Sequence, residues 1–148
     1  MGLNVYELAD PSTAFTDDGS FTNALSITAD GIVGTALHRR YYVRNDDNAL
    51  WYNNITVQAV VLEGDDIVTG ATEGFRWKLV VGNDEPLEEV WDLTSGGNQI
   101  ELSDIGEAGT GDITTFLPFW LRIEIPRSSP VKSYQNIGLR ISGDENLI

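Results

Sequence analysis

Phe119-Trp120-Leu121-Arg122-Ile123-Glu124-Ile125 decides the fold, because apolar residues alternate along it with Arg122 and Glu124. A period of two places one set of side chains on the buried face of a β-strand and the other set on the opposite face. Five other segments repeat this alternation: Leu25–Ala29, Tyr41–Arg44, Ile55–Val61, Phe75–Val81 and Ile137–Ile141. No segment carries a sustained helical stripe, so the sequence predicts an all-β protein.

Turn-forming clusters separate the alternating segments, for example Asp30-Gly31 and Gly96-Gly97-Asn98. With short strands near Val5 to Leu8 and Ile100 to Leu102, we expect about seven to nine strands in a single antiparallel β-sandwich of the Ig-like or jelly-roll type. Little helix is expected. The run from Pro86 to Trp91 predicts one helical turn before Asp92, with Pro86 at its first position.

The 148 residues fit one domain. We expect the sandwich to cover residues 24–148 and residues 1–23 to form an N-terminal arm or first strand. Ala9 to Phe15 lacks alternation, which is typical of an arm that lies on a neighbouring molecule.

The chain has no cysteine, which excludes disulfides and thiolate-ligated metal centres and suits assembly in a reducing cytoplasm. Met1 to Asp10 has neither the basic nor the apolar region of a secretory signal. The longest apolar runs are too short to span a bilayer, so no membrane association is expected.

Nine basic and 23 acidic residues give a formal net charge of −14. Such a surface repels phosphates, so we expect no binding to nucleic acid. The charge favours solubility at high concentration, or contact with a basic partner or with divalent cations. Loop carboxylates at Asp46, Asp47, Asp65 and Asp66 would suit calcium if their two loops converged, whereas solvated turns are the simpler interpretation.

No pattern of catalytic residues is present. His38 is the only histidine and lies on an expected strand, and the sequence has no nucleophile elbow, phosphate loop, dinucleotide fingerprint or zinc motif. The acidic pairs lie in turns without the aromatic walls that a glycosidase site needs. We therefore expect no enzyme, no catalytic residue, no cofactor and no resident metal.

Four tryptophans could serve the core, a subunit contact or a carbohydrate platform. Trp77 shares its face with Phe75 and Leu79, which predicts a core position. Trp120 points away from the face of its neighbours, while Trp51 and Trp91 lie at strand or loop margins. Aromatic residues are enriched at protein interfaces, so core and subunit contacts are favoured over sugar binding.

Several strings together resemble the Ig-like β-sandwich structural proteins of tailed-bacteriophage virions. They are Tyr42–Asp47, Tyr52–Val57, Phe75–Leu79 with Pro86 and Trp91, Leu102–Gly106, Pro118–Ile123 with Pro126, and Ile137–Ser142. The likeness covers residues 24–148 and is one of spacing, since none of these strings is a catalytic or ligand-binding motif.

The resemblance implies a virion structural protein assembled in the bacterial cytoplasm. Our leading hypothesis is a capsid decoration (cement) protein that binds the major capsid protein or other virion proteins as a homo-oligomer, most simply a trimer. Phe15, Phe21, Trp51 and Trp120 are the expected contact residues. A tail, neck or baseplate accessory protein and a carbohydrate-binding module are the alternatives.

Overall fold

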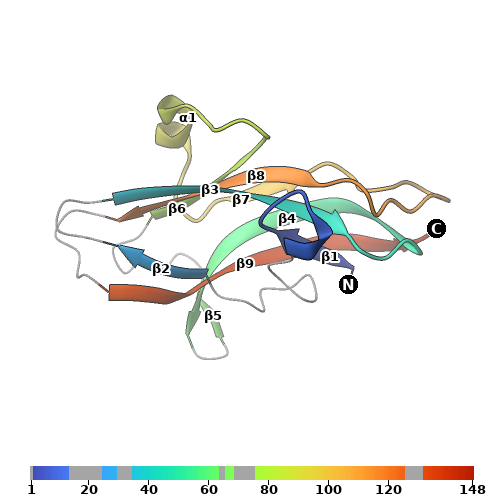
Figure 1. The fold of residues 1–148 in the computed structure, drawn as a ribbon, viewed down its shortest axis with the longest axis horizontal. Coiled ribbons are helices and arrows are strands. Elements are labelled where there is room, and N and C mark those ends of the chain that lie inside the picture. The colour runs from blue at the N-terminus through green and yellow to red at the C-terminus, as the bar shows by residue number, and fades with distance from the viewer. Residues whose placement is uncertain (1, 14–24, 30–34, 64–65, 69–75, 126–131) are drawn as a thin grey trace.

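The computed structural model describes residues 2–13, 25–29, 35–63, 66–68, 76–125 and 132–148. Over these residues the chain forms nine strands, one short α-helix and one 3₁₀ turn, Pro11–Thr13. The strands build two antiparallel sheets that lie face to face (Figure 1). The predicted all-β sandwich with little helix is confirmed.

The first sheet has the strand order β1-β3-β8-β6. Its strands are β1 (Leu3–Tyr6), β3 (Thr35–Asn45), β8 (Leu117–Ile125) and β6 (Arg76–Val81). The predicted strand at residues 119–125 is the centre of this sheet, because β8 pairs with β3 on one side and with β6 on the other. It therefore organises one whole layer of the sandwich.

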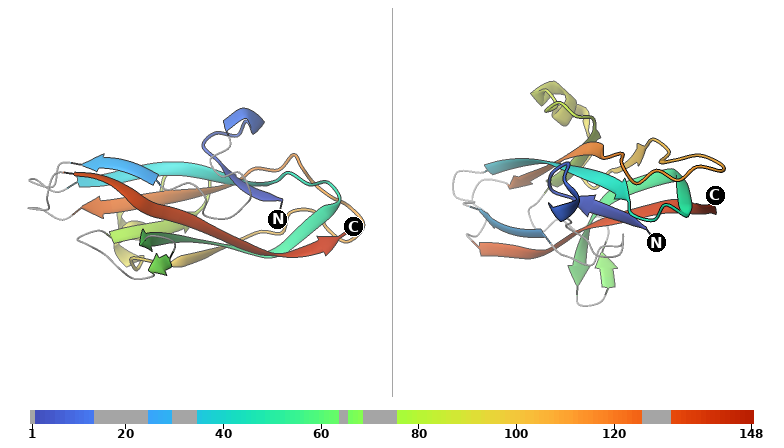
Figure 2. Two further views of the ribbon diagram at one scale, coloured as in Figure 1. Left: turned by 90° about the horizontal axis from the view of Figure 1, so that it is seen from below. Right: turned by 45° about the vertical axis from the view of Figure 1, so that its right-hand side comes forward.

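The second sheet has the strand order β2-β9-β4-β5, and β7 also pairs with β4. Its strands are β2 (Leu25–Ala29), β9 (Lys132–Leu147), β4 (Leu50–Glu63), β5 (Asp66–Val68) and β7 (Gln99–Leu102). The long strands β4 and β9 pair along most of their length, so they form the spine of this layer (Figure 2).

The core lies between the sheets and consists of the alternating residues that the sequence pattern places on one face. Its largest fully buried side chains include Trp77, Tyr52 and Phe119. Trp77 is thus a core residue, as predicted. Burial of apolar area from both sheets is the main force that holds the layers together.

Two short elements differ from the predicted bounds. The first strand ends at Tyr6, and the residues from Glu7 to Ser12 are exposed. The helix α1 (Glu88–Leu93) begins two residues after Pro86 and includes Asp92, because Leu87 has an extended backbone and its carbonyl accepts the first helical hydrogen bonds. β1 is buried in the first sheet, so the sandwich includes residues from the expected N-terminal unit.

A partly buried polar network ties both ends of the chain to β4. The backbone N–H of Gly2 donates to the Tyr52 hydroxyl (2.6 Å), which donates to Oε1 of Glu145 (2.8 Å). Burial raises the pKa of Tyr52 to about 12. Beside it the Asp46 carboxylate accepts hydrogen bonds from the side chains of Asn4 and Tyr6.

The loop between β7 and β8 packs against the β3–β4 turn. A Cβ atom on Gly111 would lie 2.2 Å from the backbone oxygen of Asn48, so only glycine permits this approach. The next residue, Asp112, accepts hydrogen bonds from Thr115 and Thr114, and these bonds lower its pKa to about 2. This loop is therefore closely fitted to its neighbour.

Candidate binding surface

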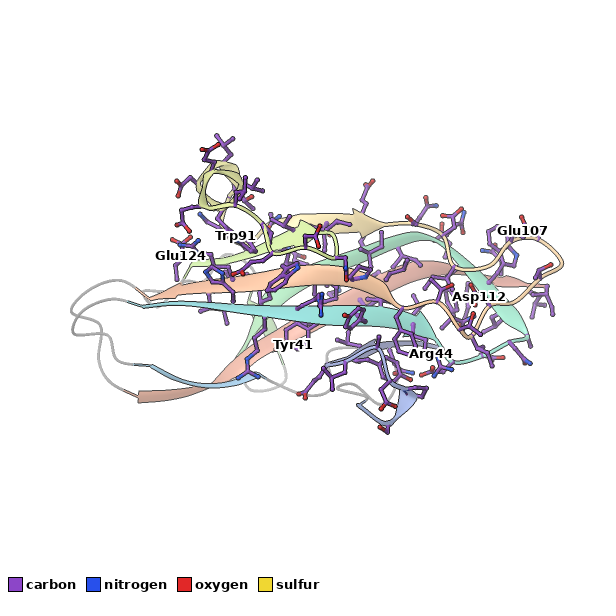
Figure 3. The ribbon with its side chains drawn as sticks, turned by 45° about the horizontal axis from the view of Figure 1, so that its top comes forward. Tyr41, Arg44, Trp91, Glu107, Asp112 and Glu124 are labelled. Atoms are coloured by element: carbon purple, nitrogen blue, oxygen red, sulfur yellow. The ribbon has the colours of Figure 1, made fainter. Side chains whose placement is uncertain are left out.

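The outer face of the first sheet concentrates cations and aromatic rings. Arg40 lies 5.4 Å from the Tyr42 ring centre and 5.8 Å from that of Trp120. Arg44 lies 5.3 Å from the Phe116 ring centre. Cations and the aromatic faces that they lie over attract one another, and Figure 3 shows Arg44 on this sheet.

α1 stands on this outer face above β6 and β8 (Figure 1). Its Trp91 is fully buried. The centre of the Trp91 ring lies 5.8 Å from the centre of the His38 ring and 5.9 Å from Cζ of the Arg122 guanidinium. Nζ of Lys78 donates to the Trp91 carbonyl oxygen (2.7 Å). Trp91 was expected at a loop margin, whereas the structure makes it the anchor of the helix.

Ion pairs complete this anchor. Arg122 donates two hydrogen bonds of 2.8 Å to the Glu88 carboxylate, a bidentate geometry that is stronger than a single contact. The pairing lowers the pKa of Glu88 and raises that of Arg122. Lys78 also pairs with Glu124 at 2.9 Å. The helix is thus held by one aromatic ring and by charges that the sheet supplies.

Apart from Trp91, every residue of α1 is exposed, and so is Leu87 before it. Leu87 is 71% exposed, Val90 40% and Leu93 89%. We call these three residues the α1 patch. The acidic residues Glu89 and Asp92 lie between and beside them and are exposed as well. An anchored helix therefore presents apolar side chains outward, which is typical of a protein-binding surface.

A shallow hollow of about 400 Å³ lies on the same sheet beside Trp120. Glu7, Leu8, His38, Arg39, Arg40 and Tyr41 form the rest of its lining. Nε1 of Trp120 donates to the Asn83 carbonyl oxygen (3.2 Å), which also accepts from Arg40 (3.0 Å). Trp120 is on the outer face, as its place between Phe119 and Leu121 predicts, and it is partly covered by its neighbours.

Two of the four expected contact residues lie within the described segments, and they belong to different sheets. Trp51 lies at the start of β4 in the second sheet and is half-buried, with its Cβ 2.9 Å from the position a Cβ would take on Gly106. Trp120 lies in the first sheet. Phe15 and Phe21 lie outside the described residues.

The sequence interpretation missed the α1 patch. Its signal was three apolar residues spaced by three, Leu87, Val90 and Leu93, among acidic residues and outside any alternating run. From sequence alone, apolar residues are assigned to the core. The structure shows that Trp91 is the buried residue of α1 and that Leu87, Val90 and Leu93 are exposed.

The two loops considered as a possible calcium site lie far apart. Asp46 and Asp47 precede β4 and Asp66 follows it, so a strand of 14 residues separates them. At ~3.3 Å per residue this is about 45 Å, too far for one ion. Asp65 lies outside the described residues. Within the described ranges no group of three or more His, Cys, Asp or Glu side chains could hold a metal ion.

The described segments contain one α-helix, of six residues, and no helix in them is long and apolar enough to cross a membrane.

Comparisons of the chain with protein-family models, curated proteins and solved structures found no match. The structure is that of an antiparallel β-sandwich with a helix docked on one outer face.

Proposed function

We propose that this chain is a structural protein of a tailed-bacteriophage virion, and first of all a capsid decoration (cement) protein that binds and stabilises the assembled head. The α1 patch is the observation that carries a binding role, because a helix is anchored by buried groups while its apolar residues face outward. The resemblance of the strand sequences to virion proteins supplies the setting.

A protein of this kind needs a rigid body and a surface that recognises the lattice, and no catalytic group. If it binds the assembled shell more tightly than the free subunits, mass action stabilises the shell. The major capsid protein or another virion protein would be its partner, and it would act as a homo-oligomer, most simply a trimer. Assembly would take place in the host cytoplasm before release of the virion.

Two measurements test this function. The mass of the purified protein in dilute solution, by mass photometry, should be that of a trimer. Gold-labelled antibody against the protein should then mark the heads of particles purified from the phage that encodes it. Unlabelled particles, together with no trace of the protein in their mass spectra, would refute the proposal.

The same micrographs distinguish a decoration protein from the main alternative, a tail, neck or baseplate accessory protein. Label at the tail, neck or baseplate, with a larger ring in solution, would assign the protein to that part of the virion. A carbohydrate-binding module is favoured only by the hollow beside Trp120. It predicts a change of tryptophan fluorescence on titration with glycans, which a decoration protein does not require.

A further inference from the structure

We propose that the α1 patch is the docking element of this chain and that its partner is a protein surface with an apolar groove bordered by Lys and Arg side chains. The inference rests on the proposed function in taking virion proteins as the partners, and it adds the site and the chemistry of the contact. The charges around the patch argue against α1 of a second copy as the occupant.

The apolar part of the contact follows from exposure and anchoring. Leu87 and Leu93 are the most exposed large apolar side chains of α1 and its flank, at 71% and 89%. They do not need to reorganise on binding, because Trp91 and the Arg122–Glu88 pair already fix the helix. A preorganised apolar surface loses little conformational entropy when a partner covers it.

The basic border follows from the charges around the patch. Residues 84–93 contain five acidic residues, and no Lys or Arg occurs between Lys78 and Arg122. Arg122 forms hydrogen bonds with Glu88 and also attracts Asp92, and Glu85 contacts His38 at 2.9 Å. The other carboxylates rim the patch, so a partner with cations at matching positions gains attraction both on approach and when bound.

A second copy of this chain does not meet that requirement. Packing α1 against α1 would bring two sets of five carboxylates together on chains that each carry a net charge of −14. The cations on the outer face already serve their own sheet: Lys78 and Arg122 hold α1, and Arg44 pairs with Asp46 at 2.9 Å. The other two arginines of this region, Arg39 and Arg40, line the shallow hollow beside Trp120, so docking of α1 into that hollow of a second copy is an outcome that the test below distinguishes.

Two patch variants and two matched controls test the inference. Leu87→Ser with Leu93→Ser removes apolar contact, and Glu89→Lys with Asp92→Lys reverses the charge. Their controls are Leu147→Ser with Ile148→Ser, and Glu101→Lys with Glu107→Lys, which change exposed residues outside α1 by the same chemistry. Circular dichroism and urea unfolding confirm that each variant is folded. Leu93→Ser alone is the fallback if the double variant is not.

The first probe is the purified phage particle stripped of this protein. We expect both patch variants to lose roughly tenfold or more in affinity, as interface anchors do, and both controls to bind as the wild type does. Patch variants that bind like the wild type would overturn the inference and leave the proposed function standing. A solution oligomer that the patch variants dissolve would also overturn it, since a second copy would then be the occupant.

The second probe separates the surface from the virion. A synthetic amphipathic helix of Leu and Lys supplies an apolar stripe bordered by cations. If the wild type binds no particle, the proposed function fails. Binding of this peptide then tests whether the α1 patch is a docking surface. Weaker peptide binding by the patch variants than by their controls supports the inference, and equal binding by all variants overturns it.

Discussion

Replacement of Trp91 by alanine should release α1 from the first sheet while the sandwich stays folded. Trp91 is fully buried, yet it lies outside the core cluster between the sheets. Its neighbours are the side chains of His38, Lys78 and Arg122 on the outer face. The loss of its ring therefore acts on the attachment of the helix rather than on the packing of the two layers.

The size of the effect follows from the buried area. A buried tryptophan removes about 150–250 Å² from water, which at ~25 cal/mol per Å² corresponds to about 4–6 kcal/mol. Compact unfolded states reduce such values by roughly 10–40%, to about 2–5 kcal/mol. Since each 1.4 kcal/mol or so is a factor of ten, the opening equilibrium of α1 should rise by roughly 30-fold or more.

Native-state hydrogen exchange read by mass spectrometry measures this opening in peptides that cover α1. Trp91→Phe is the first control: it keeps a ring and removes Nε1, which has no hydrogen-bond partner among the described residues, so it should stay near the wild type. Leu93→Ala, at an exposed position, is the second. Unchanged exchange in α1 of Trp91→Ala, or equal acceleration in β8, would refute the reasoning.

Three further outcomes test the packing of the sandwich by urea unfolding. Tyr52→Phe should cost about 1–2 kcal/mol at neutral pH through the lost hydrogen bonds. Because the folded state holds the Tyr52 proton to a pKa of about 12, against 10.0 ordinarily, this advantage of the wild type is full below pH 10 and declines as the pH rises toward 12. Asp112→Ala should be less stable than the wild type at neutral pH. That difference should shrink as the pH falls from 3.8 toward 2, because the folded state binds the Asp112 proton more weakly. Gly111→Ala should cost about 1–3 kcal/mol by overpacking, and more than Gly109→Ala, which has a positive φ but open space around it.

The strands could be predicted because their signal is local. Alternation fixes which residues face the core, so Leu121 and Ile123 are buried and Trp120 lies on the other face. Which strands become neighbours depends on contacts between distant residues. The pairing of β1 with β3, far along the chain, is not written in either segment alone.

The α1 patch, which is the candidate binding surface, could not be predicted for the same reason. The helical turn after Pro86 is visible in the sequence, but its orientation depends on Lys78 and Arg122, which come from β6 and β8. Without those partners, an observer assigns the apolar residues near Trp91 to the core. The long-range ion pairs reverse that assignment and turn Leu87 and Leu93 outward.

The anchoring of α1 by groups outside the core has a consequence for how such a protein can vary. The core cluster between the sheets and the Trp91 anchor share no residue, so their contributions to the free energy of unfolding should be nearly additive. Substitutions at Leu87 or Leu93 can then alter the affinity for a partner without loss of the fold, and core substitutions can alter stability without reshaping the patch. The α1 patch can therefore change in sequence along with the groove of the proposed partner while the sandwich stays folded.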